Sequence, residues 1–173
     1  MLRRRLGKFG LKIAEGKSRV IGFGRYEWEK ARREGGKVAT FDFLGFTHYC
    51  GKTREGYFKV KRRTSRKKLG QSLRKFTDWA RKVRGVLRKG EMLRQAKIRA
   101  MGHLSYYAIT DNMGRSSYYA YRARGILFKW LNRKSQRKAY TNWAGFNQAW
   151  AWVDWPEARV RKDLNPCRRA EAY

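Results

Sequence analysis

The segment from Ser65 to Leu87 has a residue pattern that restricts it to one structure. Its apolar residues recur at spacings of three and four: Leu69, Leu73, Phe76, Ala80, Val83 and Leu87. This spacing places them on one face of a helix, and a hydroxyl at Thr64 or Ser65 can cap the first turn. Beside that face, basic residues form two rows with a period of seven: Lys67, Arg74, Arg81 and Arg88, and Lys68, Lys75, Lys82 and Lys89. We therefore predict an amphipathic helix whose polar side is almost entirely cationic.

Three more helices are predicted after Gly90. The first is indicated by apolar residues at helical spacing: Leu93, Ala96, Ala100, Leu104 and Tyr107. The second follows a turn at 110–114, and Ser116 or Ser117 can cap it. Its expected inner side consists of Tyr118, Tyr121, Gly125, Phe128 and Leu131. The third begins after Thr141 or Asn142 and ends at Trp155-Pro156.

The N-terminal third is predicted to be rich in β-structure. Residues 18–23 and 40–46 have extended, β-prone patterns. Residues 46–50 and 57–61 flank a polar loop with glycine at both ends, as in a β-hairpin. The expected fold class is therefore α+β, with a small β-rich part followed by a helical bundle.

The charge of the chain indicates its class of partner. Lys and Arg number 44 and Asp and Glu 13, a formal net charge of +31. A hydrophobic content of 42% with 15% aromatics is nevertheless typical of a folded chain and not of a polycationic tail. Because folding brings these like charges together, we expect a polyanionic partner, most commonly a nucleic acid. An anionic membrane surface is the alternative, but no apolar run approaches the roughly 18 residues of a span, and we predict no membrane partner.

The sequence shows no residue pattern typical of a catalytic or metal site. A two-metal site for nucleotidyl transfer needs paired carboxylates, whereas the aspartates stand singly: Asp42, Asp78, Asp111, Asp154 and Asp163. His48 and His103 lack acidic or cysteine partners, and the two cysteines lie far apart. We therefore predict no catalytic residue, no metal ligand and no cofactor in this chain.

Several motifs resemble those of group II intron reverse transcriptases and occur in that family's order. Residues 10–13 with 17–21, and residues 41–46, resemble the last two motifs of the palm. Residues 62–69, 102–107 and 127–136 look like the thumb, also called the maturase-specific domain.

This resemblance implies a division of the chain into three regions. Residues 1–62 would be residual palm strands, and residues 63–138 a helical thumb or maturase-specific (X) domain. Residues 139–173 would be the start of a DNA-binding helical region with an irregular tail. By the same resemblance, Lys17, Phe43, Leu44, Gly45 and Phe46 would be relics of palm motifs.

The resemblance further implies the RNA-binding half of the family without its polymerising half, because the catalytic Tyr-x-Asp-Asp turn would precede Met1. The implied function is to hold group II intron RNA in its splicing-competent fold, while the ribozyme performs the transesterification. The implied partners are this structured RNA, target DNA and an N-terminal reverse-transcriptase polypeptide. A divalent metal would enter only with a completed catalytic palm, and the implied location is cytoplasmic, in a bacterial or organellar ribonucleoprotein.

Basic residues are the expected contacts to RNA phosphates. The first set is Arg62, Arg63, Arg66, Lys67, Lys68, Arg74, Lys75, Arg81 and Lys82. The second set is Arg122, Arg124, Lys129, Arg133, Lys134, Arg137 and Lys138. A solvated helix face is the alternative explanation, but such a face needs only mixed charge, and this one has almost no acid. The candidates for stacking on unpaired bases, with core packing as the alternative, are Tyr106, Tyr107, Tyr118, Tyr119 and Tyr121.

Two other functions stay open at this point. The chain can be one piece of a split or truncated reverse transcriptase that needs a separate palm and fingers polypeptide for RNA-directed DNA polymerisation. An exposed β edge around Val20 and Phe43 would favour that interpretation, because an incomplete palm leaves strands unpaired. A general basic RNA-binding protein is the third possibility, and the ordered motifs argue against it.

Overall fold

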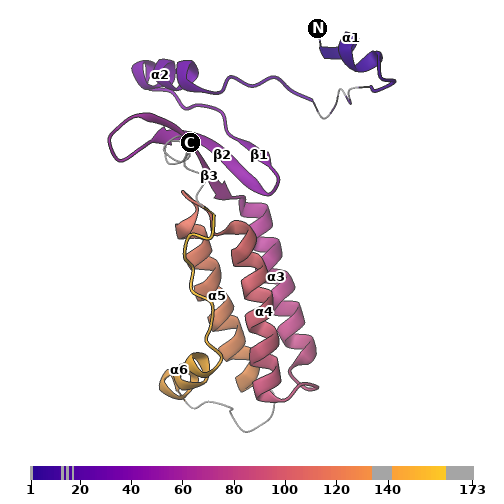
Figure 1. Cartoon of the computed structure of the whole chain (residues 1–173), viewed down its shortest axis with the longest axis vertical. Helices are drawn as coiled ribbons and strands as arrows, with labels where there is room; N and C mark the ends of the chain where they lie inside the picture. Colours follow the sequence, from indigo (N-terminus) through magenta and orange to yellow (C-terminus); the bar gives the residue numbers. More distant parts are fainter. Residues whose placement is uncertain (1, 13, 15, 17, 134–141, 163–173) are drawn as a thin grey trace, which may run out of the picture. The chain divides into compact units, whose positions relative to one another are not determined.

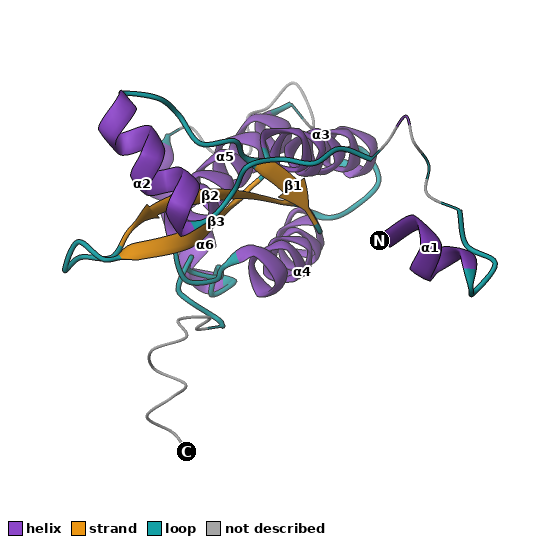
Figure 2. Cartoon of the chain, turned by 90° about the horizontal axis from the view of Figure 1, so that it is seen from above, coloured by secondary structure: helices purple, strands orange, loops and turns teal. Residues whose placement is uncertain are grey.

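A computed structural model describes residues 2–12, 14, 16, 18–133 and 142–162 (Figure 1). The helices are α1 (Leu2–Gly7), α2 (Arg25–Glu34), α3 (Arg66–Val83), α4 (Lys89–Tyr107), α5 (Met113–Asn132) and α6 (Trp143–Trp152). The strands, coloured orange in Figure 2, are β1 (Phe41–Phe43), β2 (Phe46–Lys52) and β3 (Phe58–Thr64). A three-stranded sheet is thus followed by a set of helices, which confirms the predicted α+β class.

The chain forms two compact units. The first comprises Met1–Thr40 and Tyr49–Val60, and the second comprises Phe41–His48 and Lys61–Tyr173. In the first unit, Trp28 of α2 packs on Phe58 of β3, with their ring centroids 5.5 Å apart. The second unit contains the β1–β2 turn and the helices α3 to α6.

The N-terminal part differs from the prediction at two places. Residues 18–23 form no strand, because a β-prone run is stabilised as a strand only beside a partner strand. Predicted strand 40–46 is broken by a two-residue turn at Leu44 and Gly45, whose φ angles are 48° and 84°. Two positive φ values are typical of a tight hairpin turn, and β1 pairs antiparallel with β2 across it. The predicted hairpin of residues 46–61 is confirmed as β2 and β3.

The three long helices α3, α4 and α5 run side by side in the second unit (Figures 1 and 2). The predicted cap of α3 is confirmed, because the Ser65 hydroxyl oxygen accepts a hydrogen bond from the Lys68 amide at 3.3 Å. Their common core consists of residues that are almost wholly buried: Leu69, Phe76, Ala80, Met92, Leu93, Ala96, Ala100, Leu104, Tyr119, Ala123, Leu127 and Leu131.

The inner face of α5 differs from the one predicted. Helix α5 begins at Met113, and Ser116, which was expected to cap it, lies buried within its first turns. The residues of α5 that are buried are Ser116, Tyr119, Ala123, Leu127 and Leu131. Apolar and aromatic residues occur around the whole circumference of α5. Their periodicity alone therefore did not determine which side of the helix faces the core. Small residues let helices approach closely, and this explains why Ser116 and Ala123 face the core while Tyr121 faces outward.

A buried polar cluster joins the end of β3 to α4 and α5, and we call it the Asn112 junction. The Asn112 Oδ1 atom accepts from the Thr64 amide at 2.7 Å. Its Nδ2 atom donates to the Thr64 hydroxyl and to the Tyr107 carbonyl, each at 2.7 Å. Ser116 also donates to the Tyr107 carbonyl, at 3.3 Å. The junction therefore satisfies its buried polar groups with one another.

Helix α6 packs through aromatic side chains. The predicted cap is confirmed at Asn142, whose Oδ1 accepts from the Gly145 amide at 3.0 Å. Phe146 is fully buried, and the Trp150 and Trp155 rings stack with centroids 3.8 Å apart. No helix in the described part of the chain combines the length and apolarity needed to cross a membrane.

Candidate nucleic-acid interface

The basic residues predicted on α3 lie on its solvent face. Arg66, Lys67, Lys68, Arg74, Lys75, Arg81 and Lys82 are all exposed. The single acid within these rows, Asp78, forms an ion pair with Arg81 at 3.3 Å. Both partners of that pair are exposed, so it neutralises the surface only weakly. The helix therefore presents two cationic rows to the solvent, as its sequence pattern predicts.

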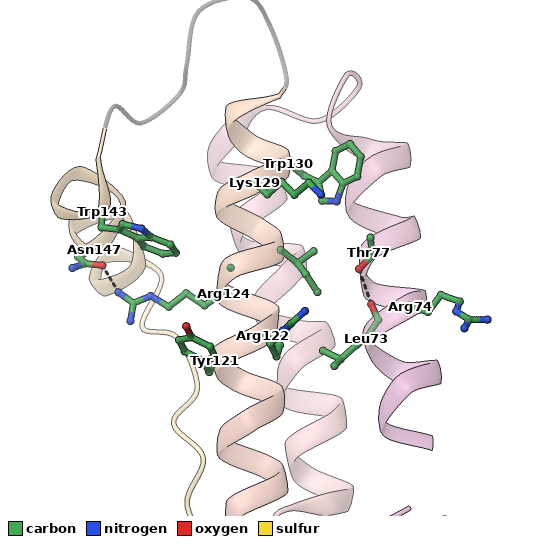
Figure 3. A pocket seen from close by; sticks show the side chains of 12 residues that line it. Leu73, Arg74, Thr77, Tyr121, Arg122, Arg124, Lys129, Trp130, Trp143 and Asn147 are labelled. Atoms are coloured by element: carbon green, nitrogen blue, oxygen red, sulfur yellow. Dashed lines mark hydrogen bonds between the residues drawn. The ribbon is translucent and has the colours of Figure 1, made fainter. Parts of the chain in front are cut away.

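A groove of about 770 Å³ lies along α5, between α3 and α6, and we call it the α5 groove (Figure 3). It brings together four of the predicted cations: Arg74, Arg122, Arg124 and Lys129. The described residues that line it include no Asp or Glu. A concave surface with several cations and no carboxylate attracts anions, because the charges reinforce one another near low-dielectric walls.

The four cationic side chains differ in their contacts and in their exposure to solvent. Arg124 is half-buried, donates a hydrogen bond to Asn147 Oδ1, and lies 5.2 Å from the Trp150 ring centroid. Its guanidinium thereby links α5 to α6 (Figure 3). Arg122 and Lys129 are exposed, and Arg74 points away from α5 at the rim formed by α3 (Figure 3). Arg74, Arg122 and Lys129 are therefore better placed than Arg124 to meet a ligand phosphate.

Two exposed aromatic residues lie at the groove, and one of them was predicted to stack on bases. Tyr121 and Trp143 line it and are 73% and 47% exposed. Tyr121 was among the stacking candidates, and Trp143 was not. One sign of them in the sequence is Gly125, which lies one helical turn from both Tyr121 and Lys129 and leaves a gap in the side-chain surface of α5. A Cβ atom at Gly125 would have no heavy atom within 4 Å.

Of the five predicted stacking residues, Tyr119 requires a correction. It is only 2% exposed and stacks on His103 with ring centroids 3.6 Å apart, so the prediction that it stacks on bases is wrong. Tyr107 is partly buried in the same cluster, 4.6 Å from His103. Tyr106 stacks on Phe46, and its hydroxyl donates to the Leu44 carbonyl at 2.8 Å. These three rings are involved in packing.

Tyr118 remains exposed, and Arg122 lies 5.8 Å from its ring centroid. Of the other predicted cations, Arg62 and Arg63 lie in β3 and Arg133 follows α5. The predicted residues Lys17, Lys134, Arg137 and Lys138 lie outside the described residues.

The proposed palm relics occupy the β1–β2 turn. Phe43 and Leu44 are 59% and 68% exposed, whereas Phe46 is buried against α4. Gly45 is required at the turn, because a Cβ atom there would lie 2.7 Å from the Tyr107 hydroxyl and its φ angle is positive.

Burial determines the protonation state of the two titratable rings in the core. Burial lowers the pKa of His103 to about 4 and raises the pKa of Tyr119 to about 12. Both rings are therefore neutral at pH 7, and neither is suited to proton transfer there. No group of three or more potential metal ligands occurs among the described residues.

The chain was compared with known proteins in three ways. No family model, no curated protein and no solved structure matches it.

Proposed function

We propose that this chain is an RNA-binding protein that uses the α5 groove and the cationic rows of α3 to hold a structured RNA. The observation that carries the proposal is the set of four cations with exposed aromatic rings and no lining carboxylate in the α5 groove. Phosphates match the cations, and unpaired bases match the rings. Single-stranded and looped regions of RNA offer both groups at once.

The resemblance to group II intron reverse transcriptases suggests which RNA this is. The motif at 62–69 covers the end of β3 and the start of α3, and the motif at 102–107 lies at the end of α4. The described part of the motif at 127–136 lies at the end of α5. On this proposal the chain acts as a maturase: it neutralises phosphates and stabilises the splicing-competent fold of a group II intron. The RNA itself then performs the transesterification, so the protein needs no catalytic residue.

Competition between two RNAs tests this function. The purified chain would be titrated with a structured group II intron RNA and with an unrelated structured RNA of equal length, over a range of salt concentrations. We expect tighter binding to the intron RNA at every salt concentration. Equal affinity for both RNAs would show that charge alone drives binding, and would contradict the maturase proposal.

One observation favours a second function, as part of a split reverse transcriptase. Phe43 and Leu44 lie exposed at the turn beside the three-residue edge strand β1. An exposed apolar turn next to a sheet edge is suited to pairing with further strands of a palm. Primer extension by this chain mixed with a polypeptide that carries the fingers and catalytic carboxylates tests this function. Extension that requires both polypeptides would support it, and none above the level of the second polypeptide alone would contradict it.

A further inference from the structure

Tyr121 presents an exposed aromatic ring at the groove. It is 73% exposed, and among the described residues it has no ring stacking or cation–π contact. Trp143 differs, because Phe128 stacks on it with centroids 4.1 Å apart and the Arg124 guanidinium lies 5.7 Å from its ring. Tyr121 is therefore the ring of the groove that is available for stacking, while Trp143 forms a wall.

The space beside Tyr121 exists because residue 125 is glycine. Helix interiors disfavour glycine by about 1 kcal/mol relative to alanine, and packing does not explain it here. A side chain would meet no neighbour within 4 Å, so close contact with another helix does not require this glycine. What glycine does provide is an open floor between Tyr121 and Lys129.

Cations flank this floor on both sides. Arg122 precedes Gly125 by three residues, and its guanidinium lies 5.8 Å from the Tyr118 ring centroid. Lys129 follows Gly125 by four residues, and its Nζ atom lies 5.6 Å from the Trp130 ring centroid. On an α-helix, residues three or four apart are neighbours on the surface. A flat ring, an open floor and a cation on each side of it correspond to the base, the sugar and the two flanking phosphates of one nucleotide.

We propose that the α5 groove takes one unpaired nucleotide of the bound RNA, with its base on the Tyr121 ring and its two flanking phosphates at Arg122 and Lys129. This inference rests on the proposed RNA-binding function and makes it more specific. A base paired within a helix cannot reach Tyr121, because its faces are covered by its neighbours. The groove thereby distinguishes bulges and loops from continuous duplex.

Three hairpin RNAs test the inference. One has a continuous stem, one has a single bulged adenosine, and one has an abasic residue at the same bulge. For the wild-type chain we expect the adenosine bulge to bind about tenfold more tightly than the abasic bulge, within the range measured for stacking of one base on an aromatic ring. Equal affinity for the two bulges would overturn the inference.

A variant that fills the groove tests the inference most directly. Gly125→Phe places a ring on the open floor without removing any charge, and we expect it to abolish the tenfold preference. Gly102→Phe is the matched control, because Gly102 is an exposed glycine of α4 whose Cβ would also meet nothing within 4 Å. The control should keep the preference. A preference that persists in a folded Gly125→Phe variant would also overturn the inference.

A second variant decides the question if Gly125→Phe fails to fold. Tyr121→Leu changes an exposed side chain and should likewise abolish the preference, and retention of the full preference would refute the role of Tyr121. Failure of the proposed RNA-binding function would give a different result from failure of the nucleotide site. In that case the wild-type chain would bind none of the three hairpins, even at low salt, whereas salt-dependent binding without preference would overturn only the nucleotide site.

Discussion

The Asn112 junction and the α5 groove lie in the same unit and differ in whether their polar side chains have partners within the protein. At the junction, Asn112 is buried and each polar atom of its side chain has a partner within 2.7 Å. In the groove, Arg122 and Lys129 point to solvent with no carboxylate among the described lining residues. A satisfied polar cluster stabilises a fold, whereas charges left without counter-ions favour a ligand. The comparison therefore separates residues that hold the bundle together from residues that are available for RNA.

Charge reversal on α3 should have the largest effect on binding. We expect Lys67→Glu, Arg74→Glu and Arg81→Glu together to weaken RNA binding at least about 1,000-fold, because three contacts become repulsive. These residues are exposed, so the free energy of unfolding should change little. The matched control reverses Lys30, Arg33 and Lys37 of the first unit, which alters the net charge equally. Equal losses in both variants, measured by filter binding, would assign binding to overall charge.

Removal of the Asn112 side chain should have the largest effect on stability. Asn112→Ala leaves the Thr64 amide without its acceptor, and we expect the free energy of unfolding to fall by about 3 kcal/mol. The control is Asn147→Ala, which removes an exposed amide of the groove and should cost less than about 1 kcal/mol. Urea denaturation of the two variants measures both values. Similar losses would mean that the junction and the groove do not differ as described.

Protonation of His103 should destabilise the core at low pH. The pKa of His103 is lowered from 6.5 to about 4, so the folded state binds fewer protons than the unfolded state between these values. Stability is then fully present above about pH 6.5 and falls by up to roughly 3 kcal/mol as the pH falls to about 4. His103→Phe keeps a ring between Tyr107 and Tyr119 and should remove this part of the loss. A pH dependence of unfolding that is unchanged in the variant would contradict the assignment.

The smallest effect is expected at the floor of the groove. Gly125→Ala should raise the free energy of unfolding by about 0.5–1 kcal/mol, since the added methyl group meets no neighbour and alanine favours the helix. Thermal unfolding followed by circular dichroism measures the change. A decrease in stability would show that the groove floor is already filled.

The sequence was sufficient to predict the parts of the fold that depend on local chemistry. The apolar stripe of α3 and the caps at Ser65 and Asn142 could be identified because a helix face and a cap involve residues only a few positions apart. Helix α2 was not predicted, because Arg25–Glu34 consists mainly of charged residues and has few apolar ones. Its Glu, Lys, Arg and Ala residues nevertheless favour a helix.

Other features depend on how distant segments pack, and they could not be predicted. The choice between Tyr119 and Tyr121 as the exposed ring required the orientation of α5, which its surrounding apolar residues left undetermined. The α5 groove required the position of α6, whose Trp143 and Asn147 form one of its walls. The cationic residues of the groove were predicted, but not that Gly125 opens a space among them.

The salt dependence of RNA binding tests the central claim most directly. Affinity for a structured RNA would be measured across salt concentrations for the wild-type chain and for the variant with Lys67, Arg74 and Arg81 replaced by glutamate. If about 6 to 8 phosphates are contacted, the log-log slope should be near −5 to −7, and it should become shallower by about 3 in the variant. A slope near zero, or the same slope in both proteins, would contradict the assignment of this cationic surface to RNA.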